Sequence, residues 1–174
     1  PHEILSHLER SIQDPELVEA LRRIRDALRT RVPAVELMTQ MGLKNGVSGY
    51  IHHTVPFALY CWLRNRGDFR AAVEEAVLLG GDTDTVGAIT GALAGAELGA
   101  GAIPKEWLDG ISDWPRSTGW MSALAQRLAV AFPEVGTGAS PGPLPLAWPA
   151  LPIRNALFAT IVLGHGARRL LPPY

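Results

Sequence analysis

The chain has 174 residues, of which 47% are hydrophobic, and sixteen basic residues against seventeen acidic ones leave a formal net charge of −1. This length and hydrophobic content are typical of one folded domain and exclude a highly charged disordered chain. The balanced charge gives no general attraction to polyanions, which counts against nucleic acid as a partner.

The single cysteine, Cys61, excludes an internal disulfide and lies in the apolar run Ala58–Leu63, where a small buried thiol fits. A reducing, cytoplasmic setting follows. The first eleven residues lack the basic and apolar regions of a signal peptide, and Gly, Pro or charged residues interrupt every apolar stretch. We therefore expect a soluble protein without a membrane partner.

Apolar residues recur at helical spacing throughout, so the predicted fold class is all-α, a single multi-helix orthogonal bundle. The first clear helix begins at Asp14-Pro15-Glu16, which supplies an N-cap, a proline at the first helical position and an acid in the first turn. It is expected to end near Arg31. A short helix follows from Pro33 to Met41, and the turn Gly42–Gly46 ends it with residues that tolerate positive φ.

The next segment, from Val47 to Asn65, is apolar on more than one side and predicts a buried helix that starts or kinks near Pro56. Asp68 is the expected N-cap of a helix from Phe69 to Leu79, which Gly80-Gly81 ends.

A further helix, from Thr85 to about Gly99, carries a glycine at every fourth position, and this spacing aligns the glycines on one edge for close helix packing. The sequence then predicts a short helix at Ile103–Trp107, another at Gly119–Phe132, a surface loop at Pro133–Pro149, and a last apolar helix at Ile153–Leu171 that closes the bundle.

Two carboxylates and two hydroxyls are crowded into Asp82-Thr83-Asp84-Thr85, between one helix end and the next helix start. Hard oxygen ligands favour Mg²⁺ or Mn²⁺ over Zn²⁺, and a divalent cation would relieve the repulsion between the carboxylates. The free N–H groups of the following helix start would favour a phosphate nearby. The simpler alternative is that Asp82 or Thr83 only caps that helix.

Three stretches together resemble the ADP-ribosylglycohydrolases: Ser48–Pro56, Gly80–Thr85 and Gly91–Ala96, in the family's order and spacing within Val47–Trp107. This resemblance implies that residues 1–174 are the C-terminal portion of an all-helical ADP-ribosylglycohydrolase-like domain that lacks its N-terminal part. It also implies a pair of Mg²⁺ or Mn²⁺ ions held in part by Asp82, Asp84 and Thr85, with Thr83 a weaker candidate.

By the same resemblance, Asp82 and Asp84 are the expected catalytic residues, as metal ligands first and acid or base groups second. Ser48, Gly49, Tyr50 and Gly81 are the expected substrate-binding residues. The family's other metal ligands belong to a Thr-Asp-Asp element preceded by a Gly-Asp motif, and this pair of motifs is absent here. A second chain or an upstream segment would then supply them.

The implied activity is metal-dependent hydrolysis of ADP-ribose glycosidic bonds in modified side chains or related substrates. Two alternatives stay open, namely a non-catalytic ADP-ribose-binding or structural module and one segment of a longer enzyme. The acceptor and the oligomeric state are left undetermined. Some residues also have structural readings: Tyr50 as a core residue, one of His52 and His53 as a packed or hydrogen-bonded histidine, and His165 as a partner of the helix dipole.

Overall fold

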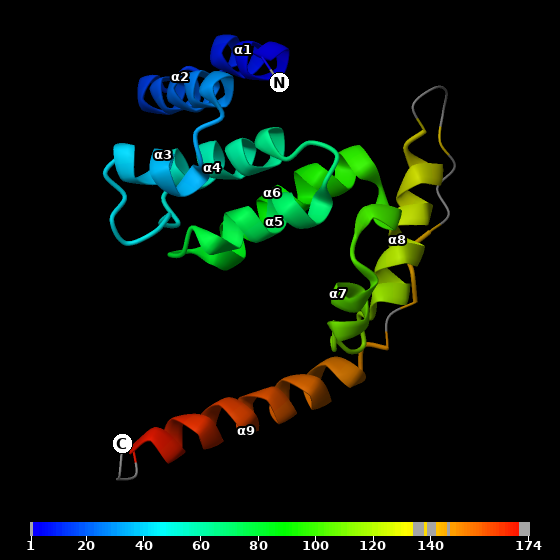
Figure 1. Ribbon diagram of the computed structural model, residues 1–174. Helices are drawn as coiled ribbons and strands as arrows, with labels where there is room; N and C mark the ends of the chain where they lie inside the picture. The colour runs from blue at the N-terminus through cyan, green and yellow to red at the C-terminus, as the bar shows by residue number, and fades with distance from the viewer. Residues whose placement is uncertain (1, 134–137, 139–141, 146, 171–174) are drawn as a thin grey trace. The chain divides into compact units, whose positions relative to one another are not determined.

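The computed structural model describes residues 2–133, 138, 142–145 and 147–170, and within these the chain is helical with no β-strand (Figure 1). The all-α prediction is confirmed. The rest of Pro133–Pro149 and the expected end of the last helix at Leu171 lie outside the described residues. The helices are α1 (His2–Ser11), α2 (Pro15–Thr30), α3 (Ala34–Gln40), α4 (Ile51–Arg64), α5 (Phe69–Leu78), α6 (Thr83–Leu98), the 3₁₀ turn η1 (Ala100–Ala102), α7 (Lys105–Gly110), α8 (Thr118–Ala131) and α9 (Ala150–Leu170).

Residue contacts divide the chain into two compact units, Pro1–Pro104 and Lys105–Tyr174. The assignment of residues 1–174 to one domain stays a prediction. No helix among the described residues has the length and apolarity needed to cross a membrane.

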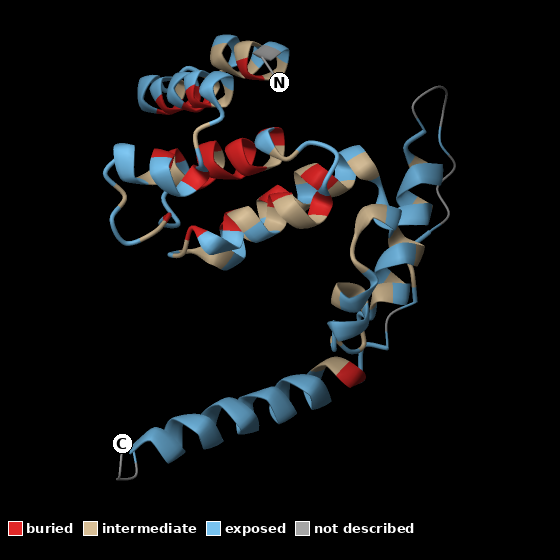
Figure 2. Cartoon of the chain, viewed as in Figure 1, coloured by how far each residue is buried: buried red, intermediate tan, exposed pale blue. Residues whose placement is uncertain are grey.

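Helix α4 forms the centre of the first unit, where α2, α5 and α6 all pack against it (Figure 1). Its Phe57, Tyr60 and Cys61 are fully buried, and Figure 2 shows most of the helix in the buried class. The helix begins at Ile51 and continues through Pro56, which is buried within it. Because α4 is apolar on several sides, it needs neighbours on several sides, and the unit provides them.

Helix α2 begins as its sequence predicts. The Oδ1 atom of Asp14 accepts hydrogen bonds from the N–H groups of Glu16 at 2.9 Å and Leu17 at 3.1 Å. These bonds satisfy two of the four N–H groups that a helix start leaves without partners. The apolar stripe that includes Leu17, Leu21 and Ile24 is buried against the core.

The glycine edge of α6 packs against α5. A Cβ atom built at Gly87 would lie 3.3 Å from a methyl carbon of Val77, and one at Gly95 would lie 3.7 Å from the ring of Phe69. The glycines therefore make room for side chains of α5, whereas a close approach of backbones was expected. Helix α6 begins at Thr83, two residues earlier than expected, and Gly99 follows its last residue with φ of 77°.

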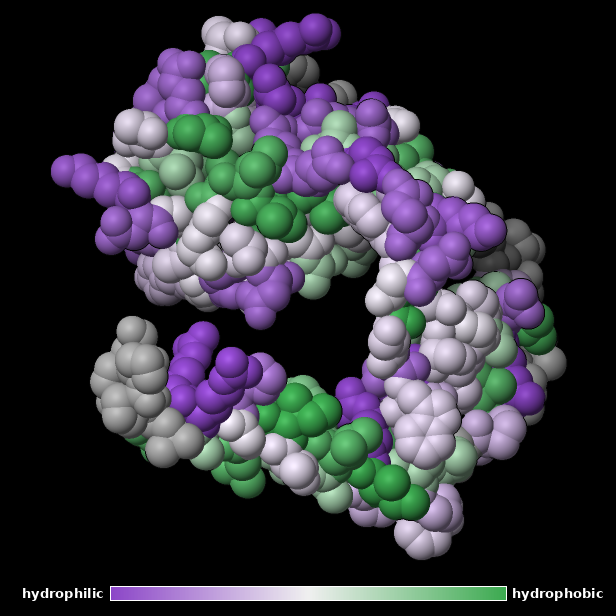
Figure 3. Space-filling view, turned by 60° about the horizontal axis from the view of Figure 1, so that its bottom comes forward, coloured by the Kyte–Doolittle hydropathy of each residue, from purple (hydrophilic) through white to green (hydrophobic). Residues whose placement is uncertain are grey.

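The second unit contains α7, α8 and α9, and Ala150 is its one buried hydrophobic residue among those described. The expectation that the last helix closes a bundle is not met within this unit, because apolar side chains of α9 such as Leu157 and Phe158 are more than 60% exposed. Figure 3 shows apolar residues gathered along this helix.

Candidate active site

A short backbone bridge joins two segments that are far apart in the sequence, the glycine loop (Gly46–Tyr50) and the aspartate turn (Gly80–Thr85). Val47 and Gly81 form an isolated parallel β-bridge. The N–H of Val47 donates to the carbonyl of Gly80 at 3.1 Å, and the N–H of Asp82 donates to the carbonyl of Val47 at 2.7 Å. The bridge brings the predicted substrate-binding and metal-binding segments together.

Two glycines permit this close approach. Gly46 has φ of 88° and Gly81 has φ of 76°, in the left-handed region that residues with a side chain rarely adopt. A Cβ atom at Gly46 would lie 2.4 Å from backbone atoms of Gly80 and Gly81, and one at Gly81 would lie 2.3 Å from the carbonyl oxygen of Val47. Any side chain at either position would push the two segments apart.

The carboxylate of Asp82 does not cap helix α6. Asp82 occupies the N-cap position of α6, but its side chain accepts no capping hydrogen bond. Its Oδ1 accepts from the hydroxyl of Thr85 at 2.9 Å instead. A Cβ atom at Gly49 would lie 2.6 Å from its Oδ2, so the missing side chain of Gly49 leaves the space that this oxygen occupies. Capping therefore does not account for the Asp82 side chain.

Asp84 lies next to Asp82 and is exposed. A hydrogen bond with the Asp82 carboxyl, and then the N–H of Thr85 donating to Asp84 Oδ1 at 2.9 Å, hold the pKa of Asp84 below its ordinary value. Two acidic groups within hydrogen-bonding reach of each other are a suitable pair of ligands for a divalent cation, which would neutralise both.

Asp82, Asp84 and the Thr85 hydroxyl are the oxygen donors here that match Mg²⁺ or Mn²⁺. Within the described residues, however, no group of three or more His, Cys, Asp or Glu side chains is arranged to hold a metal ion. The turn thus fits such an ion in donor type and provides only part of a coordination shell. Thr83, the weaker candidate, is half-buried as the first residue of α6.

Two residues of α4 form hydrogen bonds with Ser48 of the glycine loop. The Oγ of Ser48 lies 2.8 Å from Nδ1 of His53, and the hydroxyl of Thr54 donates to the Ser48 carbonyl at 2.8 Å. Tyr50 is 49% exposed, so the reading of Tyr50 as a core residue is wrong. Its ring stands edge-on to the rings of His52, at 4.6 Å between centroids, and His53, at 5.4 Å.

Tyr50 also faces the start of α2. Partial desolvation raises the pKa of its phenol, and the negative charges of Glu16 and Asp14 raise it further. The phenol therefore stays a neutral hydrogen-bond donor in the physiological range. An exposed, neutral aromatic side chain that follows Gly49 in the glycine loop is suited to stacking on a base or sugar.

Sequence reasoning missed one pair in this region. His52 Nε2 lies 2.8 Å from Oδ2 of Asp14, a residue 38 positions away that was interpreted only as a helix cap. Both histidines are thus hydrogen-bonded, whereas one was expected to be. No local pattern could have revealed the pair, because nothing in either segment indicates that the first turns of α2 and α4 meet.

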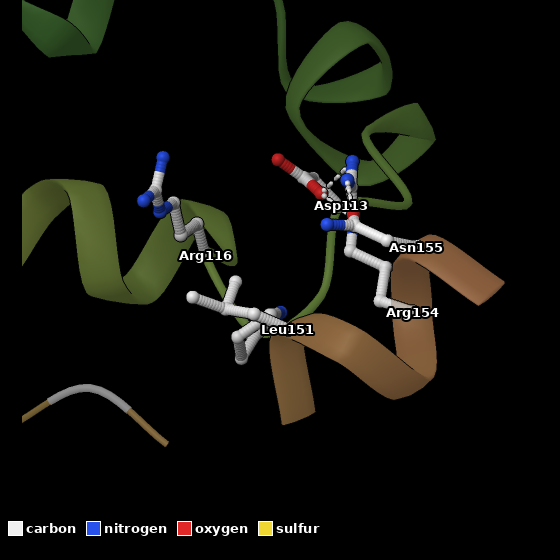
Figure 4. A pocket seen from close by; sticks show the side chains of 6 residues that line it. Asp113, Arg116, Leu151, Arg154 and Asn155 are labelled. Atoms are coloured by element: carbon white, nitrogen blue, oxygen red, sulfur yellow. Dashed lines mark hydrogen bonds and ion pairs between the residues drawn. The ribbon is translucent and has the colours of Figure 1, made fainter. Parts of the chain in front are cut away.

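Each of the two units contains a pocket. In the first, a pocket of about 240 Å³ lies beside the two histidines, and its lining comprises Glu16, Glu19, Ala20, Arg23, Met41, His52 and His53. In the second, Figure 4 shows a pocket of about 250 Å³ in which Arg154 is paired with Asp113 at 2.9 Å. Neither of these two pockets is lined by the predicted catalytic, substrate-binding or metal-binding residues.

The sequence profile of the ADP-ribosylglycohydrolase family matches residues 1–137, and the chain belongs to this family. The family resemblance seen in the sequence is confirmed.

Individual relatives match over parts of their length. ADP-ribosylarginine hydrolase Tri1 of Serratia proteamaculans is 40% identical over 88 residues, covering 50% of this chain and 22% of Tri1. ADP-ribosylhydrolase ARH3 of Mus musculus is 29% identical over 109 residues, covering 57% of this chain and 27% of the relative. Human ARH3 is 28% identical over 140 residues, covering 74% and 36% respectively. The chain thus spans well under half the length of these relatives. No solved structure matches it significantly.

Proposed function

We propose that this chain supplies part of the active site of an enzyme that hydrolyses the glycosidic bond between ADP-ribose and a modified side chain or a small leaving group. The observation that carries the proposal is the bridge between Val47 and Gly81, which places the glycine loop against the Asp82 carboxylate. Family membership and the activities named for the relatives Tri1 and ARH3 support this substrate class.

In this proposal Asp82, Asp84 and the hydroxyl of Thr85 are ligands of Mg²⁺ or Mn²⁺. When bound, such ions would supply Lewis-acid stabilisation of the charge that develops as the glycosidic bond breaks. The two aspartates would orient the attacking water through their free oxygen atoms and accept its proton as a second role. Because Asp82 Oδ2 lies against Gly49, its position relative to the sugar would be set by the loop backbone.

The glycine loop would hold the substrate. The exposed ring of Tyr50 would stack on ADP-ribose, and the backbone around Ser48, Gly49 and Gly81 would approach it closely, since two of the three lack a side chain. The start of α6 lies two residues after Gly81, and N–H groups of its first turn would favour a phosphate nearby.

The remaining metal ligands would come from an N-terminal part or from a second chain. Two observations support this division: the partial set of donors in the aspartate turn, and the match to less than two-fifths of each relative described above. The same partial set favours a second candidate function, that of a non-catalytic module that binds ADP-ribose weakly.

Calorimetry and an activity assay separate these functions. The protein is titrated with Mn²⁺ and then with ADP-ribose, and both should bind. Asp84→Asn should weaken Mn²⁺ binding by at least roughly ten- to a hundredfold, which is the cost of changing even a residue that only supports a metal ligand. The exposed Asp109 provides a control, because Asp109→Asn removes an equal charge far from the turn in sequence and in another unit.

Turnover of an ADP-ribosylated peptide is then measured with the chain alone and with the complete native protein. Activity in the complete protein that Asp84→Asn abolishes supports the enzyme. ADP-ribose binding without turnover in either form supports the module. If the complete protein shows no dependence on Mg²⁺ or Mn²⁺, the metal-dependent proposal is refuted.

A further inference from the structure

Asp14 uses its two oxygen atoms for two different contacts. Oδ1 accepts from the first free N–H groups of α2, at 2.9 and 3.1 Å. Oδ2 accepts from Nε2 of His52 at 2.8 Å. One carboxylate therefore closes the start of α2 and ties it to the first turn of α4.

His52 is held through Nε2, while its buried Nδ1 has no hydrogen-bond partner among the described residues. The whole residue is only 9% exposed, and its Nδ1 lies 3.5 Å from Oε2 of Glu16. Because Nε2 faces an acceptor, it carries the proton and donates it to Asp14. A buried imidazole that is hydrogen-bonded to Asp14 cannot rotate without losing this contact.

The histidine in turn contacts the proposed ligand-binding side chain. The ring of Tyr50 lies edge-on to His52, with 4.6 Å between the centroids. Tyr50 is half exposed and would otherwise be free to sample several rotamers. From the other side, His53 and Thr54 hold Ser48, and Gly49 lies against Asp82.

We propose that Asp14 is a positioning residue: through His52 it fixes the ring of Tyr50 and the glycine loop in the arrangement that ADP-ribose binding requires. This inference rests on the proposed function for the identity of the ligand. Asp14 is not one of the proposed ligand-binding or metal-binding residues, and its effect would pass through the imidazole.

Asp14→Ser separates positioning from capping. Serine is a good N-cap, so α2 keeps its start, but its hydroxyl is too short to cap the helix and reach His52 together. The matched control is Asp68→Ser. Asp68 caps α5 in the same way, by accepting from the N–H of Ala71 at 2.9 Å, and it lies on a different helix from the histidine contact.

Two measurements are made on each variant. The first is an NMR spectrum of the backbone amides of Ser48, Gly49 and Tyr50 without ligand. The second is the dissociation constant for ADP-ribose in the presence of Mn²⁺. We expect Asp14→Ser to shift these amides and to weaken ADP-ribose binding about tenfold, at the lower end of what loss of a positioning partner costs. Asp68→Ser should change neither.

Asp14→Asn provides the rescue. Asparagine also caps helices, and its amide can donate to His52 if the imidazole takes the other tautomer. It should restore binding to within about threefold of the native protein, as the partial loss of a charge-assisted hydrogen bond implies.

Different experimental results would refute the proposed function and the positioning role of Asp14. If the native protein does not bind ADP-ribose, the proposed ligand is wrong, and the loop amides still decide whether Asp14 positions the loop. If these amides are unmoved in Asp14→Ser, or move equally in Asp68→Ser, the positioning role is refuted.

Discussion

Gly81 is the position at which the link between backbone geometry and the candidate site is most directly tested. Gly81→Ala puts a Cβ atom 2.3 Å from the carbonyl oxygen of Val47, where backbone rather than a flexible side chain would have to move. The substitution also forces alanine into φ of 76°. It should therefore both strain the turn and separate it from the glycine loop.

The expected magnitude follows from two contributions. The left-handed conformation costs alanine about 1–2 kcal/mol. Separation of the segments breaks the two hydrogen bonds of the bridge, each worth about 1 kcal/mol. Gly81→Ala should thus lower the free energy of unfolding by about 3–4 kcal/mol.

The neighbouring Gly80 provides the control. It has φ of 71°, and a Cβ atom there would meet nothing within 4 Å. Gly80→Ala therefore costs only the conformational strain of about 1–2 kcal/mol, and the gain from a stiffer unfolded chain is the same for both variants. Urea unfolding followed by circular dichroism measures the difference, expected near 2 kcal/mol. Equal destabilisation by the two substitutions would refute the reasoning.

Three further predictions concern the first unit. Tyr60→Phe should lower the free energy of unfolding by about 1–2 kcal/mol in urea titrations, because the buried phenol donates to the carbonyl of Val32, which would lose its partner. Cys61 should resist a thiol reagent at pH 8 until the chain unfolds, since burial raises its pKa; rapid modification of the native protein would contradict this. The hydrogen bond from His52, together with those from the α2 backbone, lowers the pKa of Asp14. The ionised Asp14 therefore stabilises the folded protein fully above the ordinary carboxyl pKa of about 4, and this stabilisation is lost as the pH falls through the lowered pKa. In unfolding experiments from pH 6 downwards, the stability difference between the native protein and Asp14→Asn should shrink over that lower range; a constant difference would argue against the linkage.

Local signals predicted much of the helical framework. Asp14 and Asp68 cap α2 and α5, and the glycines at 42 and 46 have the positive φ expected of them. The apolar run around Pro56 correctly predicted a buried α4. Each of these predictions depends on neighbours within one or two helical turns, which a single sequence displays.

Long-range pairings could not be predicted in the same way. The resemblance singled out both the glycine loop and the aspartate turn, but nothing in their spacing indicates a bridge between Val47 and Gly81. The contact of Asp14 with His52 was missed because each residue has a sufficient local explanation. The exposure of α9 was missed because an apolar pattern predicts burial without identifying what would cover it.

The aspartate turn is joined to the glycine loop through main-chain hydrogen bonds, and this affects how its side chains can be replaced during evolution. Backbone hydrogen bonds and two residues without side chains join the turn to the glycine loop, whereas, among the described residues, its acidic and hydroxyl groups bond only within the turn. A descendant could exchange those groups for neutral or softer ones and keep an unaltered scaffold. Loss of the proposed chemistry and loss of the bridged backbone would therefore be separable events, and substitutions at positions 82, 84 and 85, the proposed ligands, would alter ion preference while the bridge is kept.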